Sequence, residues 1–400
     1  MSRHSSKAAW VPSLFFTKGV SYVIVTLISL VLLRQLGLSA AATCCFVAFC
    51  HLPWMLKCWW KPYIDRAMSY RWWIIITQFL LAATFAAIAF LLRSMVATIA
   101  LLYLTALLTA IHNVAADGFF RQGNTPSHLS TVRELSRKFA VAIGQGMLVM
   151  AAGNLQVLYR NDLYYSWQVM FYLAAGLLLL LFFWHWAKLP MRTEIDTEPA
   201  DTDMPSPLAL GSAVVFLFFY PFAQGIVGKA SVLFLIDATR QGGLGLSPQE
   251  FGFVMGTVGI VGLTVGGLWG KSLISRWGPS SCLWLMSLTM LVPALIYTGL
   301  GLWQPTDLAV ISICVLADQL AYGFGFAAYL QILGHVSHRE TAKSVMALSL
   351  LLSCLTASAL LLTDYYTTFL TALALSLLSP FAAWTIRKYG RHFNRPSTGR

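Results

Sequence analysis

Apolar residues occur in long runs along the whole chain, and short polar stretches separate them. A run of about 20 apolar residues is long enough for a helix to cross about 30 Å of hydrocarbon. We predict twelve membrane-spanning helices at residues 12–33, 40–60, 72–92, 95–118, 133–155, 165–187, 209–236, 248–271, 281–303, 308–333, 343–363 and 367–386. The composition agrees, because the 400 residues are 58% hydrophobic and only 10% charged, whereas soluble domains carry about 25% charged residues.

One polar segment divides these runs into six and six. The stretch "KLPMRTEIDTEPADTDMPSP" contains five of the fifteen acidic residues of the chain together with four prolines. It is too polar to span a membrane and too rich in proline to form a firm helix. We interpret 188–208 as a solvated cytoplasmic linker between a six-helix half at 1–187 and a second at 209–400, which ends in a basic tail. An acidic binding segment is the alternative.

The net charge of +12 suggests nucleic acid as a partner, but its distribution argues against that. With the amino terminus inside and twelve spans, 20 of the 27 lysines and arginines fall on cytoplasmic segments. Only Arg34, Arg93, Arg160 and Arg240 fall on the opposite side. This positive-inside bias predicts that both termini are cytoplasmic. The basic excess also suits anionic lipid headgroups, so we expect membrane lipids rather than nucleic acid as partners.

No sequence motif indicates catalysis, a metal or a cofactor. "VGGLWGKS" resembles a phosphate-binding loop, but Val265 stands where the first glycine is required, and no strand precedes it. "HVSH" has weak metal spacing and is typical of a solvated turn. We therefore expect no catalytic residue, no metal, no cofactor and no enzymatic activity.

Four ionisable residues lie in equivalent spans of the two predicted halves, at different depths: Lys18, Asp117, Lys229 and Asp318, in spans one, four, seven and ten. A charge at the middle of a bilayer costs about 2.5–3.5 kcal/mol, so such residues usually face a cavity. In a transporter of two six-helix halves these four spans line the central cavity, near the midplane site. A buried carboxyl group can take up and release protons, and lysines can bind an anionic solute. A purely structural pair, Asp117 with Arg121 or Arg133 for example, is an equally good interpretation.

Glycines recur in span 248–271 at four-residue spacing, at Gly262, Gly266 and Gly270 among others. Small residues at that spacing allow two helices to approach closely. We therefore predict a close helix contact along this span.

Several stretches, in order along the chain, resemble one known family. The matches are Lys57, Trp60, Pro62 and Asp65 to a Lys-x-x-Trp-x-Pro-x-x-Asp motif, Asp117 to a span-four Gln-Asp-Ile-x-x-Asp motif, and Arg133 with Lys138 before "GQG" to the start of span five. "DQLAYGFGFAAYLQIL" is similar to span ten of the same family. The family is the AmpG-like muropeptide permease and peptide-acetyl-CoA transporter group of the major facilitator superfamily.

The resemblance implies an all-α fold of twelve helices with 6+6 pseudo-symmetry. It also implies a monomeric permease that imports a muropeptide-like solute across the bacterial inner membrane by proton symport and alternating access. We predict Asp117 and Asp318 as proton-coupling or cavity acids, and as residues of the substrate cavity Lys18, His112, Asn113, Gln224, Lys229 and Gln319. The implied cytoplasmic gate consists of Lys57, Asp65, Arg66, Arg121, Arg133 and Lys138.

The chain departs from the family at the residues expected to carry protons. Asn113 replaces an acid, His112 replaces a glutamine, and Gln224 stands where close relatives have an acid, while Lys18 is a gained cation. We therefore expect a more anionic solute, or one that is bound differently. A siderophore permease, a sensor that kept the fold without transport, and a membrane-embedded transferase are the alternatives.

Overall fold

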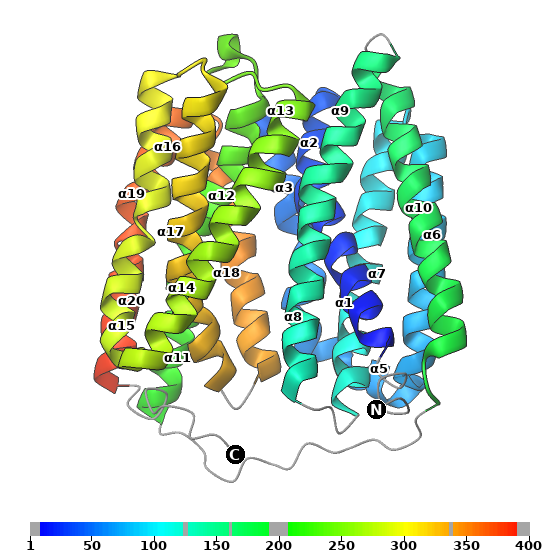
Figure 1. Cartoon of the computed structure of the whole chain (residues 1–400), viewed down its shortest axis with the longest axis horizontal. Helices are drawn as coiled ribbons and strands as arrows, with labels where there is room; N and C mark the ends of the chain where they lie inside the picture. The colour runs from blue at the N-terminus through cyan, green and yellow to red at the C-terminus, as the bar shows by residue number, and fades with distance from the viewer. Residues whose placement is uncertain (1–8, 123–126, 160–161, 192–206, 336–338, 390–400) are drawn as a thin grey trace. The chain divides into compact units, whose positions relative to one another are not determined.

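The computed structural model describes residues 9–122, 127–159, 162–191, 207–335 and 339–389, and in these residues all regular structure is helical (Figure 1). The chain divides into two compact units. The first comprises Met1–Leu36 and Leu56–Pro199, and the second comprises Gly37–Met55 and Ala200–Arg400. The predicted halves at 1–187 and 209–400 stay a prediction, and most of the predicted linker lies outside the described residues.

The first unit is built from long helices with two π-helical turns. Its elements are α1 (Trp10–Val23), η2 (Ile24–Ile28), α2 (Ser29–Gln35), α5 (Lys57–Ala67), α6 (Tyr70–Leu91), α7 (Met95–Arg121), α8 (Ser127–Ala142), η3 (Ile143–Leu148), α9 (Val149–Leu158) and α10 (Leu163–Lys188). Its core includes Trp10 against Phe119 and Phe15 against Phe120, so α1 packs on α7 through aromatic rings.

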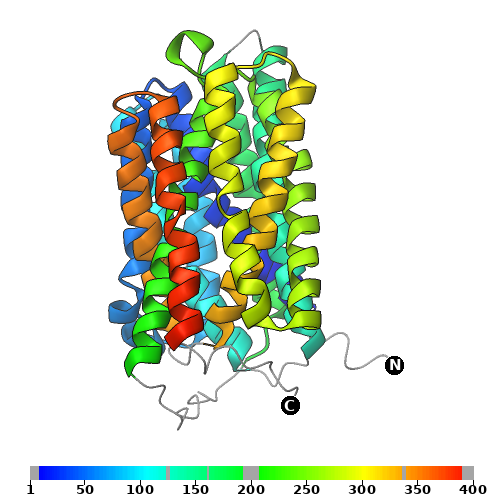
Figure 2. The same ribbon diagram turned by 90° about the vertical axis from the view of Figure 1, so that its left-hand side faces the viewer.

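The second unit combines long helices with shorter ones that follow each other end to end. Its elements are α3 (Ala40–Cys50), α4 (Leu52–Met55), α11 (Pro207–Phe219), α12 (Phe222–Ile236), η4 (Thr239–Gln241), α13 (Pro248–Phe253), η5 (Val254–Val258), α14 (Gly259–Trp277), α15 (Pro279–Thr289), α16 (Val292–Trp303), α17 (Leu308–His335), α18 (Arg339–Leu360), α19 (Tyr365–Ser376) and α20 (Leu378–Tyr389). Figure 2 shows α18 in orange and α20 in red beside α11 in green.

The fold class is confirmed as an all-helical, multi-pass membrane protein. Ten helices or joined helices in the described chain are long and apolar enough to cross a membrane, and the pair Ala40–Met55 with Lys57–Ala67, bent by 51°, makes eleven. Eleven of the twelve predicted spans correspond to these helices. The twelfth is the span predicted at 133–155. It falls on α8, η3 and α9, where only Gly146–Leu158 forms a short apolar helix.

Local sequence explains where several helices begin and break. Ser39 and Asp162 accept hydrogen bonds from the first turns of α3 and α10, which satisfies amide groups that a helix start leaves unpaired. Proline has no amide hydrogen, so it is tolerated in the first turn of a helix and kinks or breaks a helix further along. Pro221 therefore coincides with the break between α11 and α12, and Pro293 begins α16 after α15.

The glycine spacing in span 248–271 does mark a close helix contact, as predicted. A Cβ at Gly262 would lie 2.7 Å from the Leu316 carbonyl oxygen, and one at Gly270 would lie 2.7 Å from the Phe324 carbonyl oxygen. These distances are shorter than any ordinary contact, so α14 and α17 meet backbone to backbone. We call this line of contact the glycine seam, with Gly262, Gly266 and Gly270 on α14 and Gly323 on α17.

Candidate functional site

Lys18 and Asp117 form an ion pair inside the first unit. The Lys18 Nζ atom on α1 lies 2.5 Å from Asp117 Oδ1 on α7, and the two side chains are 18% and 17% exposed. The Lys18 ammonium also lies 5.6 Å from the centre of the Phe15 ring. The structure thus brings two predicted cavity residues together. The partner of Asp117 is Lys18, whereas the sequence suggested Arg121 or Arg133.

The predicted gate cations form other contacts. The Arg133 guanidinium lies over the rings of Phe15 and Phe120, at 5.7 and 5.1 Å from their centres. Such contacts attract a cation to the negative face of a ring. Arg121 is half-buried at the end of α7, and the Lys138 side chain lies outside the described residues. The described contacts of Arg133 therefore favour a role in holding α8 against α1 and α7.

The end of α5 is held by a small polar cluster. Asp65 accepts hydrogen bonds from Lys61 at 2.8 Å and from the Tyr70 hydroxyl at 2.6 Å. The Tyr70 ring in turn packs so closely on α7 that a Cβ at Gly118 would lie 2.5 Å from it. Asp65, predicted as a gate residue, thus connects α5 to α6. Of the other predicted gate residues, Lys57 is buried and Arg66 is exposed.

A buried chain of hydrogen bonds crosses the first unit, and sequence reasoning missed most of it. Ser13 Oγ contacts His185 Nε2 at 2.9 Å, His185 Nδ1 contacts Gln78 Oε1 at 2.9 Å, and Gln78 Nε2 donates to Thr17 at 3.1 Å. The chain joins α10, α6 and α1 one residue away from Lys18. The signals in the sequence were that His185 and Gln78 are polar inside apolar runs, and we expect such a histidine to be a satisfied core residue.

His112 and Asn113, both predicted substrate residues, lie fully inside the first unit on α7. Their side chains are 0% and 8% exposed. His112 Nδ1 contacts the Thr77 hydroxyl at 3.1 Å. Lys18, Asp117 and His185 all lie within electrostatic range of the imidazole. The structure therefore gathers four of the predicted residues into one region of the first unit.

Asp318 lies in a different environment in the second unit. It is 3% exposed on α17 and accepts hydrogen bonds from Gln319 Nε2 at 2.8 Å and from the Tyr297 hydroxyl at 3.4 Å. Among the described residues no lysine or arginine pairs with it. Asp318 is thus a buried carboxyl group held by neutral donors, whereas Asp117 faces a cation.

Two other predicted substrate residues lie on α12 in the second unit. Gln224 is buried and donates to the Met290 carbonyl oxygen. Lys229 is half-buried and lies within electrostatic range of His51 and of the Cys44 and Cys354 thiols. The helices α3 and α12 both pack on α18. Among the described side chains, no three His, Cys, Asp or Glu residues could hold a metal ion.

Asp237, just after α12, is a buried acid that sequence reasoning did not select. It is 4% exposed and accepts a hydrogen bond from the Tyr365 hydroxyl at 2.5 Å. The same residue accepts the Gly245 amide through its carbonyl oxygen. Asp237 therefore ties the loop between α12 and α13 to the start of α19.

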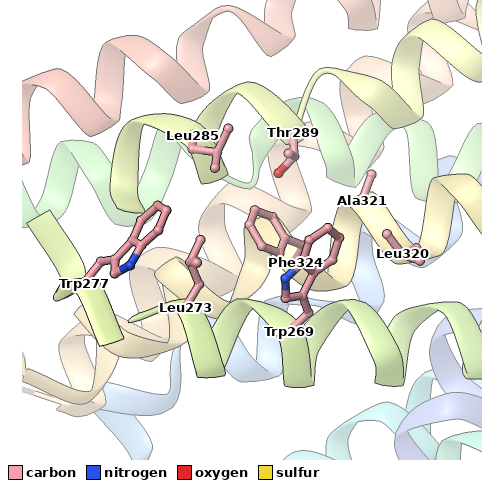
Figure 3. Close-up of a pocket in the computed structure, with 8 residues that line it drawn as sticks. All are labelled: Trp269, Leu273, Trp277, Leu285, Thr289, Leu320, Ala321 and Phe324. Atoms are coloured by element: carbon pink, nitrogen blue, oxygen red, sulfur yellow. The ribbon is translucent and has the colours of Figure 1, made fainter. Parts of the chain in front are cut away.

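One hollow in the described part of the second unit is apolar. It holds about 350 Å³ between α14, α15 and α17, with Trp269 against Phe324 in its wall (Figure 3). Its eight lining residues, all labelled in Figure 3, carry no charge. Several are exposed on the outside of apolar helices, including Trp269 and Leu285. Such a lining suits hydrocarbon rather than a polar solute.

The chain is similar to known transporters in sequence and in fold. The profile of the Major Facilitator Superfamily matches residues 10–361. The anhydromuropeptide permease of Escherichia coli (strain K12) is 24% identical over 332 residues, which are 76% of this chain. The same region is 62% of that permease, so the chain spans less than two thirds of the length of this relative.

Two solved structures share the fold. One is a bacterial homologue of the human lysosomal transporter Spinster, with a TM-score of 0.65, 15% identity and coverage of 100% of both chains. The other is a D-xylose–proton symporter, with a TM-score of 0.66, 13% identity and coverage of 95% of this chain and 96% of that one. At such identities the likeness concerns the fold alone.

Proposed function

The chain belongs to the Major Facilitator Superfamily, a family of secondary transporters of small solutes and not of enzymes, and from that premise we propose that it imports a muropeptide-like solute across the bacterial inner membrane. The observation that carries the proposal is the similarity over 332 residues to the anhydromuropeptide permease. The motif matches at Lys57, Asp65 and Asp117 support it.

Transport would proceed by alternating access and be driven by protons. A membrane potential of 100 mV supplies about 2.3 kcal/mol for each charge moved. Asp318 is our first candidate for the coupling site, because a carboxyl group buried among neutral donors can exchange a proton without breaking an ion pair. Asp117 is the second candidate, and a proton taken up there would release Lys18.

The remaining features of the proposal come from charge. The basic bias of the loops supports an orientation with both termini in the cytoplasm. Lys229 supports an anionic group on the solute, because its half-buried ammonium lies deep in α12. The proposed cytoplasmic gate consists of six residues: Lys57, Asp65, Arg66, Arg121, Arg133 and Lys138. The working unit is proposed to be a monomer.

The proposal is tested by uptake of labelled anhydro-muropeptide into proteoliposomes that contain the purified protein, with and without an imposed pH gradient. We expect uptake that depends on the gradient. No uptake by folded protein would exclude this solute, and the same assay would then be repeated with iron–siderophore complexes. Binding without transport would instead indicate a sensor that kept the fold.

A further inference from the structure

Three buried polar atoms on α7 have no hydrogen-bond partner among the described residues. They are Thr109 Oγ1, His112 Nε2 and Asn113 Oδ1. The three residues are 0%, 0% and 8% exposed. An unsatisfied buried polar atom costs about 1–3 kcal/mol, and in folded proteins such atoms are uncommon. Three of them within five residues therefore mark a place with a specific use.

The three atoms belong to one face of the helix. Thr109, His112 and Asn113 stand at positions i, i+3 and i+4, which are neighbours on a helix surface. The ion pair of Asp117 lies one turn further along from Asn113. The polar face of α7 thus consists of three groups without a hydrogen-bond partner among the described residues, followed by Asp117, whose charge is paired with Lys18.

The hydrogen bonds of Thr77 define the chemistry of the imidazole. The Thr77 hydroxyl donates to the Trp73 carbonyl oxygen at 2.6 Å, so its own oxygen is left to accept a hydrogen bond. His112 Nδ1 lies 3.1 Å from that oxygen, so with the hydroxyl proton directed to the Trp73 carbonyl we assign the ring proton to Nδ1. In the neutral ring, Nε2 is then a bare lone pair, which accepts hydrogen bonds and donates none.

The unpaired face therefore consists mainly of acceptors. His112 Nε2 and Asn113 Oδ1 are lone pairs, and the Thr109 hydroxyl can accept as well. Lys18 and Asp117 cancel each other nearby, so the local charge does not attract an anion. A carboxylate or phosphate would place its own lone pairs against these acceptors, whereas a neutral donor would satisfy them.

We propose that Thr109, His112 and Asn113 form a binding site for an uncharged hydrogen-bond donor, a sugar hydroxyl or an amide N–H, on the solute that the protein carries. The inference rests on the proposed transport function and deepens it. It assigns a neutral, donor-rich part of the solute to α7. Thr77 is a positioning residue, because it holds the His112 tautomer and does not touch the solute.

The test compares hydroxyl removal at two threonines of the same helix. Thr109→Val removes an unpaired hydroxyl, whereas Thr105→Val removes one that already donates to the Leu101 carbonyl oxygen at 2.8 Å. Binding of labelled anhydro-muropeptide to the full-length protein in nanodiscs is measured, with competition by N-acetylglucosamine, which has hydroxyl and amide donors, and by glucose, which has hydroxyls alone. The competitors separate the two sources of the donor.

We expect Thr109→Val and His112→Phe to weaken binding by about 5- to 150-fold, because each leaves a donor of the solute unpaired. Thr105→Val should change binding less than twofold, and Thr109→Ser, which keeps a hydroxyl, should restore it. Equal binding by folded Thr109→Val, His112→Phe and wild type would overturn the inference.

A second measurement does not depend on the muropeptide. Nitrogen NMR of protein labelled with ¹⁵N-histidine, with His112 assigned through His112→Phe, should show a proton on Nδ1 and a bare Nε2. Saturating N-acetylglucosamine should then shift Nε2 alone. A proton on Nε2, or no shift with this sugar, would overturn the inference. A shift with the sugar in a protein that neither binds nor transports the muropeptide would instead reject the proposed function and retain the donor site.

Discussion

The ion pair between Lys18 and Asp117 should be worth more than any exposed charge of this protein. At 2.5 Å and an effective dielectric constant of about 20, the attraction is about 7 kcal/mol, and the cost of removing both groups from water offsets much of it. Removing one partner of a deeply buried pair costs about 3–5 kcal/mol. Because the two side chains are 18% and 17% exposed, we expect about 3 kcal/mol for either single change.

The assay is a double-mutant cycle on unfolding. Lys18→Gln, Asp117→Asn and the double variant are purified in detergent, and the free energy of unfolding is measured by denaturant titration. Each single variant leaves an unpaired charge, whereas the double variant leaves two neutral amides. The double variant should therefore lose less than either single one, which corresponds to a coupling energy of more than about 3 kcal/mol. Lys271→Gln, at an exposed lysine on α14, is the control and should leave stability unchanged.

Uptake by the same variants separates the two roles that the sequence left open for Asp117. If the pair only holds α1 against α7, the double variant should transport nearly as well as wild type. If Asp117 also exchanges protons, the double variant should fold but lose uptake driven by the pH gradient. Single-variant losses below about 1 kcal/mol that simply add in the double variant would refute the reasoning, since no buried pair would then exist.

Three further changes test other parts of the structure. Gly270→Leu should destabilise the protein by about 1–3 kcal/mol, since its Cβ would lie 2.7 Å from the Phe324 carbonyl oxygen, and an unchanged melting temperature would contradict the glycine seam. Tyr365→Phe removes the 2.5 Å donor to buried Asp237 and should cost about 1.5–3 kcal/mol on unfolding, whereas a loss within error would show that this bond is not needed. Asp318→Asn should keep the fold within about 1 kcal/mol, because its partners are neutral, yet abolish proton-driven uptake, and persisting uptake would exclude it as the coupling site.

The positions of the spans could be predicted from the sequence because a backbone in hydrocarbon must satisfy its own hydrogen bonds. Runs of apolar residues therefore translate directly into helices. The positions at which these helices break or change their winding were harder to predict from the sequence. Pro221 and Pro293 mark two of them, but the π-helical turns at Ile24–Ile28 and Val254–Val258 have no such marker. They depend on how neighbouring side chains pack, which a single sequence does not contain.

The sequence predicted which residues belong to the candidate site, but not which of them contact each other. A charge inside an apolar run is rare enough to select Lys18 and Asp117 at once. Their partnership joins residues 99 positions apart, and the nearer arginines were equally reasonable partners. Thr109 escaped notice because a threonine in a membrane helix usually bonds to its own backbone. Asp237 escaped notice because an acid at the end of a span looks ordinary.

The glycine seam makes α14 and α17 a single mechanical part. Where two backbones touch without side chains between them, there is no layer of flexible atoms to absorb a slide or a roll. A shift of one residue along the seam would drive a side chain into the opposite main chain. The two helices should therefore move together as a rigid body during a transport cycle. Any deformation of the second unit should occur between other pairs of helices.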